Sequence, residues 1–172
     1  MVKLNREEMF PIVDETGAVI GSATRRECHS GSKLLHPVVH LHVFDKEGQL
    51  FLQKRSESKD IQPGKWDTAV GGHVDFGEDV DTALMREANE ELGITVRGPR
   101  LLYRYVFESD VERELVNTFM CVSDLSEITT DPDEISDGKF FRFEDIERMI
   151  GEGKTTPNFV LEFDKLKEKI LR

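Results

Sequence analysis

The sequence predicts an α/β (α+β) fold in which helices cover a mixed β-sheet and a β-hairpin lies at the N-terminal end. Two features support this class. Apolar segments of strand length face one another across short turns, which is typical of antiparallel hairpins and not of a purely parallel sheet. Later segments carry apolar residues at helical spacing. The 172 residues suit one domain, because domains commonly contain about 100 to 150 residues.

The first two hairpins are predicted from apolar segments on either side of turn sequences. Residues 10–22 contain two such stretches around DETG at 14–17, which predicts the N-terminal hairpin. Residues 36–44 and 49–53 flank DKEG and predict a second hairpin with central strands.

A helix is the most regular feature of the remaining chain. Pro63 breaks the chain before a short apolar segment at 66–70, and the glycine pair that follows implies a tight backbone site. Asp79 suits the start of a helix at 80–92, and Gly93 suits its end. Further strands are predicted at 100–107, 115–122 and 139–143, and further helices at 144–150 and 158–171.

Composition narrows the class of protein. The formal net charge of −11 argues against a nonspecific hold on nucleic acid, which needs clustered Lys and Arg. No apolar run approaches the roughly 20 residues of a membrane span, and residues 1–10 lack the features of a secretory signal. The chain carries Cys28 and Cys121 only, which suits a reducing cytoplasm. A cytoplasmic protein is expected, without a membrane or nucleic-acid partner.

The helix at 80–92 places carboxylates where apolar residues are expected. Glu87 and Glu91 fall inside the apolar arc of a helical wheel and Glu90 at its edge, whereas a solvated helix would carry them opposite. Burying a bare carboxylate costs several kcal/mol unless a cation compensates. Mg²⁺ suits such oxygen ligands, with Mn²⁺ as a substitute. The arc expected to face the core comprises Val80, Ala83, Leu84, Met85, Ala88 and Leu92.

Residues 72–94 read GHVDFGEDVDTALMREANEELGI and resemble the Nudix box. The positions that carry the resemblance are Gly72, Glu78, Arg86, Glu87, Glu90, Glu91 and Gly93. The resemblance implies a single Nudix domain over residues 1–172, folded as an α-β-α sandwich, with 1–30 as an N-terminal hairpin extension. It also implies a pyrophosphohydrolase that cleaves a diphosphate linkage in a small molecule such as a nucleoside diphosphate derivative.

The resemblance also implies which residues act. In the family the matching glutamates bind Mg²⁺ together with the carbonyl of the leading glycine, which assigns metal binding to Gly72, Glu87, Glu90 and Glu91. Glu78 matches a position with a structural role.

Catalysis needs groups beyond the metal ligands. Besides Glu90 and Glu91, Arg86 is a candidate because it is spaced to orient Glu90 through an ion pair. Family members draw a general base from the box helix or from a later loop, where Glu134 is the candidate. The alternative for Glu134 is an ordinary acidic loop.

Segments within about residues 10–143 also resemble type I isopentenyl-diphosphate isomerase, which shares the Nudix fold. Three histidines and two glutamates form a second metal site in that enzyme, and such ligands suit zinc, manganese or iron. The alternative is that the matching residues belong to an ordinary strand, loop and turn. The matching residues are His29, His36, His73, Glu112 and Glu114.

Two basic residues and one glycine extend this comparison. Arg55 and Lys59 match isomerase residues that hold the substrate diphosphate, although a surface loop would also explain them. The isomerase carries a cysteine where this chain has Gly71, so isomerisation lacks its acid or base. A hydrolase is therefore expected. The alternatives are an isomerase-like enzyme and a noncatalytic diphosphate sensor, and the chain is expected to be a monomer or homodimer.

Overall fold

A computed structural model describes residues 7–171 of the chain. The predicted domain, 1–172, and its N-terminal extension, 1–30, therefore include positions outside the described residues. The strands are β1 Met9–Val13, β2 Val19–Thr24, β3 Leu35–Phe44, β4 Leu50–Arg55, β5 Trp66–Thr68, β6 Val70–His73, β7 Arg100–Glu108, β8 Arg113–Val122 and β9 Ile135–Phe141. The helices are α1 Arg25–Cys28, α2 Val80–Leu92, the short 3-10 helix Leu125–Glu127, α3 Phe143–Gly151 and α4 Pro157–Ile170.

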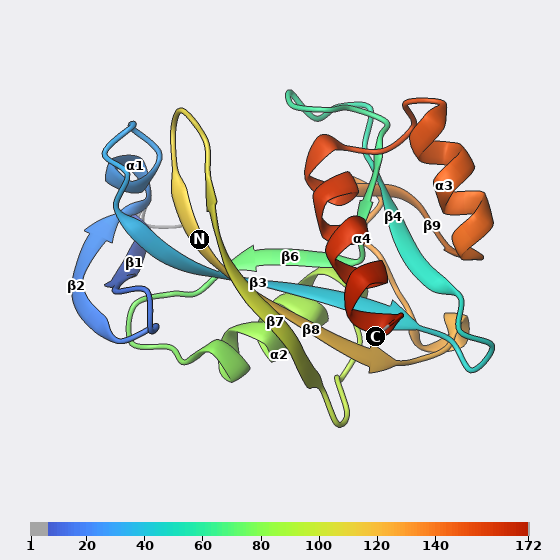
Figure 1. Cartoon of the computed structure of the whole chain (residues 1–172), viewed down its shortest axis with the longest axis horizontal. Coiled ribbons are helices and arrows are strands. Elements are labelled where there is room, and N and C mark those ends of the chain that lie inside the picture. Colours follow the sequence, from blue (N-terminus) through green and yellow to red (C-terminus); the bar gives the residue numbers. More distant parts are fainter. Residues whose placement is uncertain (1–6, 172) are drawn as a thin grey trace, which may run out of the picture.

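The predicted mixed sheet and N-terminal hairpin are both confirmed. β1 and β2 form an antiparallel pair, and seven further strands form a sheet in the order β5-β4-β3-β8-β7, with β6 beside β3 and β9 beside β4. β3 and β8 run parallel over all ten positions of β3, while the other pairs are antiparallel. In Figure 1, the β1–β2 hairpin forms one end of the molecule and α3 the other.

The two faces of β3 separate two helical layers. Val39, Leu41 and Val43 belong to a buried cluster that includes apolar residues of α2. Phe44 belongs to a second cluster that includes Phe159 and Phe163 of α4. Because neighbouring side chains of a strand point to opposite faces, α2 and α4 cover opposite sides of the sheet. Figure 1 shows these layers, which agree with the predicted α-β-α arrangement.

The second predicted hairpin is confirmed, but the pairing of its two strands is short. β3 and β4 share a single register pair, Phe44 with Leu50. β3 also pairs with β8 on one side and, from Val38 to Leu41, with β6, where Val38 lies opposite His73 and Leu41 opposite Val70. The pairing of β3 with β4 is therefore confined to the residues next to the turn.

Several predicted boundaries also need correction. The segment predicted at 66–70 is two strands, β5 and β6, and β6 continues through Gly71 and Gly72 to His73. The strand predicted at 139–143 begins earlier, at Ile135, and ends at Phe141, because Phe143 opens α3. β7 and β8 extend the predicted strands slightly, and α4 begins at Pro157.

The helix α2 begins and ends as predicted. The Asp79 side chain accepts a hydrogen bond from the backbone N–H of Thr82 at 2.7 Å, and Gly93 adopts a left-handed conformation with φ 65°. One residue of the predicted core-facing arc is misplaced. Met85 is 38% exposed, because it lies at the margin of the arc, away from buried Leu84 and Ala88.

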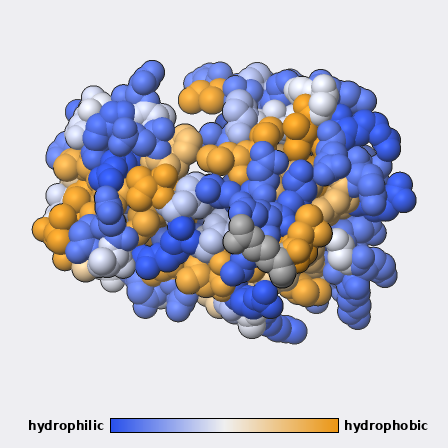
Figure 2. Space-filling model, in the orientation of Figure 1, coloured by the Kyte–Doolittle hydropathy of each residue, from blue (hydrophilic) through white to orange (hydrophobic). Residues whose placement is uncertain are grey.

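The surface is largely hydrophilic on the face shown in Figure 2, with apolar side chains gathered over the β1–β2 end. Val19 and Ile20 of β2 are among the exposed apolar residues. Across residues 7–171, no helix has both the length and the apolar character needed to cross a bilayer.

Candidate active site

A cavity of about 320 Å³ lies beside the glutamate face of α2. It is bounded by α2, by the end of β4 with the following loop, and by the acidic loop before β9. Six residues that the sequence singled out separately therefore meet in one place. The cavity is lined by Gln53, Arg55, Lys59, Glu87, Glu90, Glu91, Asp131, Glu134 and Ile135.

Burial changes the ionisation of the two inner glutamates. Burial, together with the nearby Glu87 charge, raises the pKa of Glu91 to about 8. Burial likewise raises the pKa of Glu87. Glu91 accepts a hydrogen bond from the backbone N–H of Gly71 at 3.1 Å, which holds its carboxylate against β6. Glu90 differs, because its side chain is 58% exposed, as its place at the edge of the arc predicts. A divalent cation would remove the desolvation penalty from the inner pair.

Gly72 allows the helix to approach β6 closely. A Cβ atom at Gly72 would collide with the carboxylate group of Glu87. The constraint at Gly72 is one of space and not of backbone conformation, because its φ does not lie in the left-handed region and any side chain there would displace the Glu87 carboxylate. This contact places the backbone of β6 beside the glutamates of α2.

Arg86 ties the loop before α2 to the glutamates on the helix. Its guanidinium donates two hydrogen bonds to Glu78, both at 2.9 Å, and one to the backbone oxygen of His73 at 3.0 Å. It also donates to Glu87 at 2.8 Å and to Glu90 at 3.4 Å. The paired hydrogen bonds from Arg86 lower the pKa of Glu78. Arg86 thus fixes the carboxylate of Glu87, and Glu78 holds the arginine in place.

The acidic loop supplies Glu134 and a residue that the sequence analysis missed. Glu134 forms an ion pair with Lys59, and its side chain remains 61% exposed. Asp131 lines the same cavity, and its backbone oxygen accepts hydrogen bonds from Glu134 at 3.1 Å and Ile135 at 2.9 Å. Its position in the same acidic loop, three residues before Glu134, was the available signal.

A second cluster of potential ligands lies at the β1–β2 end of the sheet. One ligand atom from each of His29, His36, His73 and Glu112 lies within 4.8 Å of the others. The Nε2 atoms of the three histidines are buried and have no hydrogen-bond partner. His29 Nε2 lies 3.0 Å from Glu112 Oε2, but the alignment makes no hydrogen bond. Buried nitrogens that converge without partners are the donor set expected around a transition metal.

Glu114 completes the set that the sequence predicted. Its Oε2 atom lies 3.9 Å from Nε2 of His73 and 4.0 Å from Nε2 of His36. Burial, together with the nearby Glu112 charge, raises its pKa to about 7. Burial lowers the pKa of His73 to about 3, so this imidazole is neutral and its Nε2 lone pair is free to coordinate a metal.

Phe10 forms an apolar wall of this histidine cluster. Its ring stacks on His73 with the ring centroids 4.5 Å apart and on His36 with the centroids 5.6 Å apart. The residue comes from β1, so the N-terminal hairpin closes one side of the cluster. The sequence analysis did not predict that Phe10 packs against the histidines, because the ligand pattern contains only histidines and glutamates.

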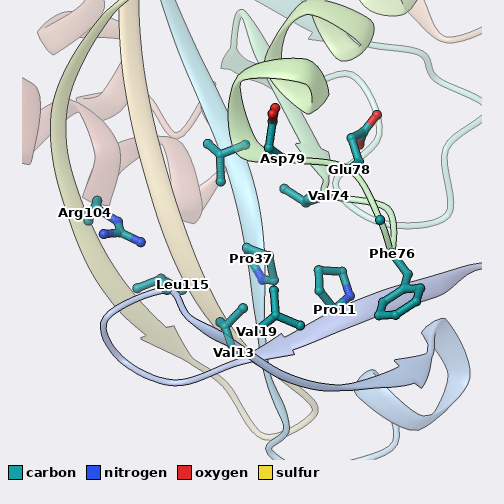
Figure 3. A pocket seen from close by; sticks show the side chains of 13 residues that line it. Pro11, Val13, Val19, Pro37, Val74, Phe76, Glu78, Asp79, Arg104 and Leu115 are labelled. Atoms are coloured by element: carbon teal, nitrogen blue, oxygen red, sulfur yellow. The ribbon is translucent and has the colours of Figure 1, made fainter.

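A larger cavity, about 500 Å³, lies elsewhere, between the hairpin, β3 and the loop before α2 (Figure 3). Its walls are mainly apolar, with Arg104 at one side and Glu78 and Asp79 at another. None of the predicted metal ligands lines it. Glu78 and Asp79 already bond Arg86 and the start of α2, so we place the chemistry in the smaller cavity beside the glutamates.

The fold and the cavity are those of a small α/β enzyme. Glutamates of α2 and the basic side chains of Arg55 and Lys59 line one cavity. The family model described as the NUDIX domain matches residues 34–159, so the chain belongs to the Nudix hydrolase family. An uncharacterized Nudix hydrolase of Listeria monocytogenes is 34% identical over 90% of this chain and 91% of its own length.

Similarity extends to isomerases and to a solved structure. Isopentenyl-diphosphate Delta-isomerase 1 of Photorhabdus laumondii is 30% identical over 92% of this chain and 99% of its own length. The crystal structure of DR0079 from Deinococcus radiodurans superposes with a TM-score of 0.72 at 27% identity, covering 87% of this chain and 92% of that chain. The predicted resemblance to both groups is confirmed. Members of the Nudix family generally use a divalent metal such as Mg²⁺.

Proposed function

We propose that the chain hydrolyses a diphosphate linkage in a small molecule such as a nucleoside diphosphate derivative, using Mg²⁺ held by α2. Glu87, Glu90, Glu91 and the backbone carbonyl of Gly72 would hold the ion. The observation that carries this proposal is the buried carboxylate of Glu91, whose pKa of about 8 reflects an unmet need for positive charge. Mn²⁺ can replace Mg²⁺ at such an oxygen site.

The remaining residues of the cavity have roles that follow from their positions. Arg55 and Lys59 also line the cavity and would bind the phosphate oxygens of the substrate. Bound Mg²⁺ supplies charge neutralisation and lowers the pKa of a water molecule. Glu134 would accept the proton of that water, since it lines the cavity and is held there by its ion pair with Lys59. Arg86 is a positioning residue, since it holds Glu87 and Glu90.

The histidine cluster would hold a second, transition metal. The support is the convergence of three unpartnered Nε2 atoms with two carboxylates. Elemental analysis of protein purified without added metal, followed by titration with Zn²⁺ and Mn²⁺, tests this part separately. We expect stoichiometric binding that is lost in His73→Ala and retained in His42→Ala, which lies outside the cluster. Absence of binding in the unaltered protein would remove this site and leave the Mg²⁺ proposal standing.

The enzymatic proposal is tested with a substrate panel. The protein is incubated with Mg²⁺ and nucleoside diphosphates, nucleotide sugars, dinucleotides, thiamine diphosphate or isopentenyl diphosphate, and product masses are recorded. We expect phosphate or nucleotide release that falls about 1000-fold in Glu91→Gln, the size of a charge interaction of several kcal/mol. Asp81→Asn is the matched control, because Asp81 is an exposed acid on the same helix. Glu134→Gln should lose about 100-fold if this residue is the base.

Two other outcomes would replace the proposal. Rearranged isopentenyl diphosphate without phosphate release would show an isomerase, the activity that the name of the Photorhabdus relative gives. Tight binding of a panel compound without turnover would show a sensor.

A further inference from the structure

Glu162 of α4 is a carboxylate buried among hydrogen-bond donors on the face of the sheet opposite α2. Glu162 is 1% exposed. Five side chains from β3, β7 and β8 donate to its two oxygen atoms, so no lone pair is left facing an apolar wall. The donors are His40 at 2.7 Å, His42 at 3.2 Å, Tyr103 at 2.7 Å, Tyr105 at 2.5 Å and Thr118 at 3.0 Å.

One of these donors also reaches the active site. His40 uses Nδ1 to bond Glu162, which fixes the plane of the ring. Its other edge lines a polar cavity of about 130 Å³, together with Gln53, Arg55, Asp67, Thr68, Gly71, Glu91 and Asn158. Gln53, Arg55 and Glu91 also line the glutamate cavity, so the two cavities adjoin.

Gly71 shows how close the ring lies to the candidate metal ligands. A Cβ atom on Gly71 would lie 3.7 Å from Nε2 of His40, in ordinary contact. The backbone N–H of the same glycine bonds Glu91. The imidazole therefore lies beside Gly71, the residue whose N–H bonds the carboxylate proposed to hold Mg²⁺.

We propose that His40, oriented by Glu162, donates a proton to the departing oxygen of the substrate. This inference rests on the proposed diphosphate hydrolysis. The attacking water forms a new bond to phosphorus and gives its proton to Glu134. The bond from phosphorus to the bridging oxygen breaks, both of its electrons go to that oxygen, and Nε2 of His40 supplies the proton. Solvent then returns a proton to His40 and removes one from Glu134.

The surroundings of His40 favour the cationic form that a donor needs. Burial alone would lower its pKa, but the hydrogen bond and charge of Glu162 raise it above the ordinary value. Glu114 of β8 and Asp67 of β5 act in the same direction. The remaining titratable or charged groups around it are Tyr103 and Tyr105 on β7, Arg55 on β4, His73 on β6 and Glu91 on α2.

His42 offers a matched control within the same network. It lies two residues further along β3 on the same face, and it bonds the other oxygen of Glu162. It is 1% exposed and does not line the polar cavity. Substituting His42 disturbs the buried network as His40 substitution does, but removes nothing from the site.

The test compares His40→Asn with His42→Asn on the fastest substrate of the panel, at saturating Mg²⁺ across a pH series. We expect kcat of His40→Asn to fall about 100-fold near neutral pH and its alkaline limb to disappear. His42→Asn should keep that limb. An unchanged limb in His40→Asn, or equal losses in both variants, overturns the proposal.

A measurement without substrate separates this proposal from the proposed function. In protein with ¹⁵N-labelled histidine, NMR should show His40 cationic near neutral pH, and Glu162→Gln should shift its titration to lower pH. A neutral His40 under these conditions overturns the donor role whatever the activity. If the unaltered protein cleaves no diphosphate, the proposed function fails, and the donor role that rests on it fails with it.

Discussion

Two glutamates lie on opposite sides of the same sheet and meet opposite electrostatic surroundings. Burial and the nearby negative charge of Glu87 raise the pKa of Glu91 on α2 to about 8, although its carboxylate accepts a hydrogen bond from the backbone N–H of Gly71. Glu162 on α4 is more deeply buried, yet hydrogen bonds from His40 and His42 outweigh burial and lower its pKa. Burial alone therefore does not identify a cation site. The supply of donors separates a carboxylate that has few hydrogen bonds, such as Glu91, from one that the protein has already satisfied, such as Glu162.

The largest expected effect on stability comes from removing the satisfied carboxylate. Glu162→Leu removes the side-chain acceptor that five donors share in the interior. We expect the free energy of unfolding to fall by about 3 kcal/mol, as when one partner of a buried ion pair is lost. Urea denaturation in EDTA measures it.

Glu91→Leu is the contrasting variant. It removes a poorly satisfied carboxylate, so the metal-free protein should lose no stability while activity with Mg²⁺ disappears. A loss of stability equal to that of Glu162→Leu would mean that the two sites do not differ as the structure indicates.

The second expected effect is a pH dependence of Mg²⁺ binding. With a pKa of about 8, Glu91 carries a proton in the metal-free protein at neutral pH, and Mg²⁺ must displace it. Mg²⁺ affinity should therefore rise about tenfold per pH unit between pH 6 and 8, then level off. Calorimetric titration measures both the affinity and the released proton.

The proton on Glu91 also makes the stability of the metal-free protein depend on pH. Because folding raises the pKa of Glu91, the protonated carboxyl stabilises the fold fully below its ordinary pKa, and that contribution is lost as pH rises through about 8. The melting temperature in EDTA should fall across this range, and Glu91→Gln should flatten the decline. If Mg²⁺ affinity did not change with pH, Mg²⁺ binding would not displace a proton from Glu91, and this prediction would be wrong.

The two regions also differ in how far the sequence predicts them. The helix α2 was predictable to the residue because its start at Asp79 and its end at Gly93 are local signals. The place of Glu91 within the apolar arc followed from helical geometry. The network around Glu162 had no such signal, since it joins residues separated by 120 and 122 positions in the chain. Only tertiary packing brings those groups together.

The sequence next to each strand likewise does not predict which distant strands pair with it. The turn after β3 predicts its short pairing with β4, but not the longer pairings of β3 with β8 and β6. The histidine cluster depends on this outcome, because the parallel register sets His36 opposite Glu114 and the antiparallel one sets Val38 opposite His73. A resemblance to a known ligand pattern predicted that set, whereas spacing along the chain did not.

The smallest expected effect on stability comes from removing one of the five hydrogen bonds to Glu162. Tyr105→Phe removes one of the five hydrogen bonds but keeps the ring, over which Lys165 Nζ lies 4.4 Å from the centroid. Since four donors remain, we expect the free energy of unfolding to fall by about 1 kcal/mol, the usual net value of a single hydrogen bond. Urea denaturation beside Tyr103→Phe provides the comparison. A loss as large as that of Glu162→Leu would show that one bond, and not the number of donors, keeps this carboxylate ionised.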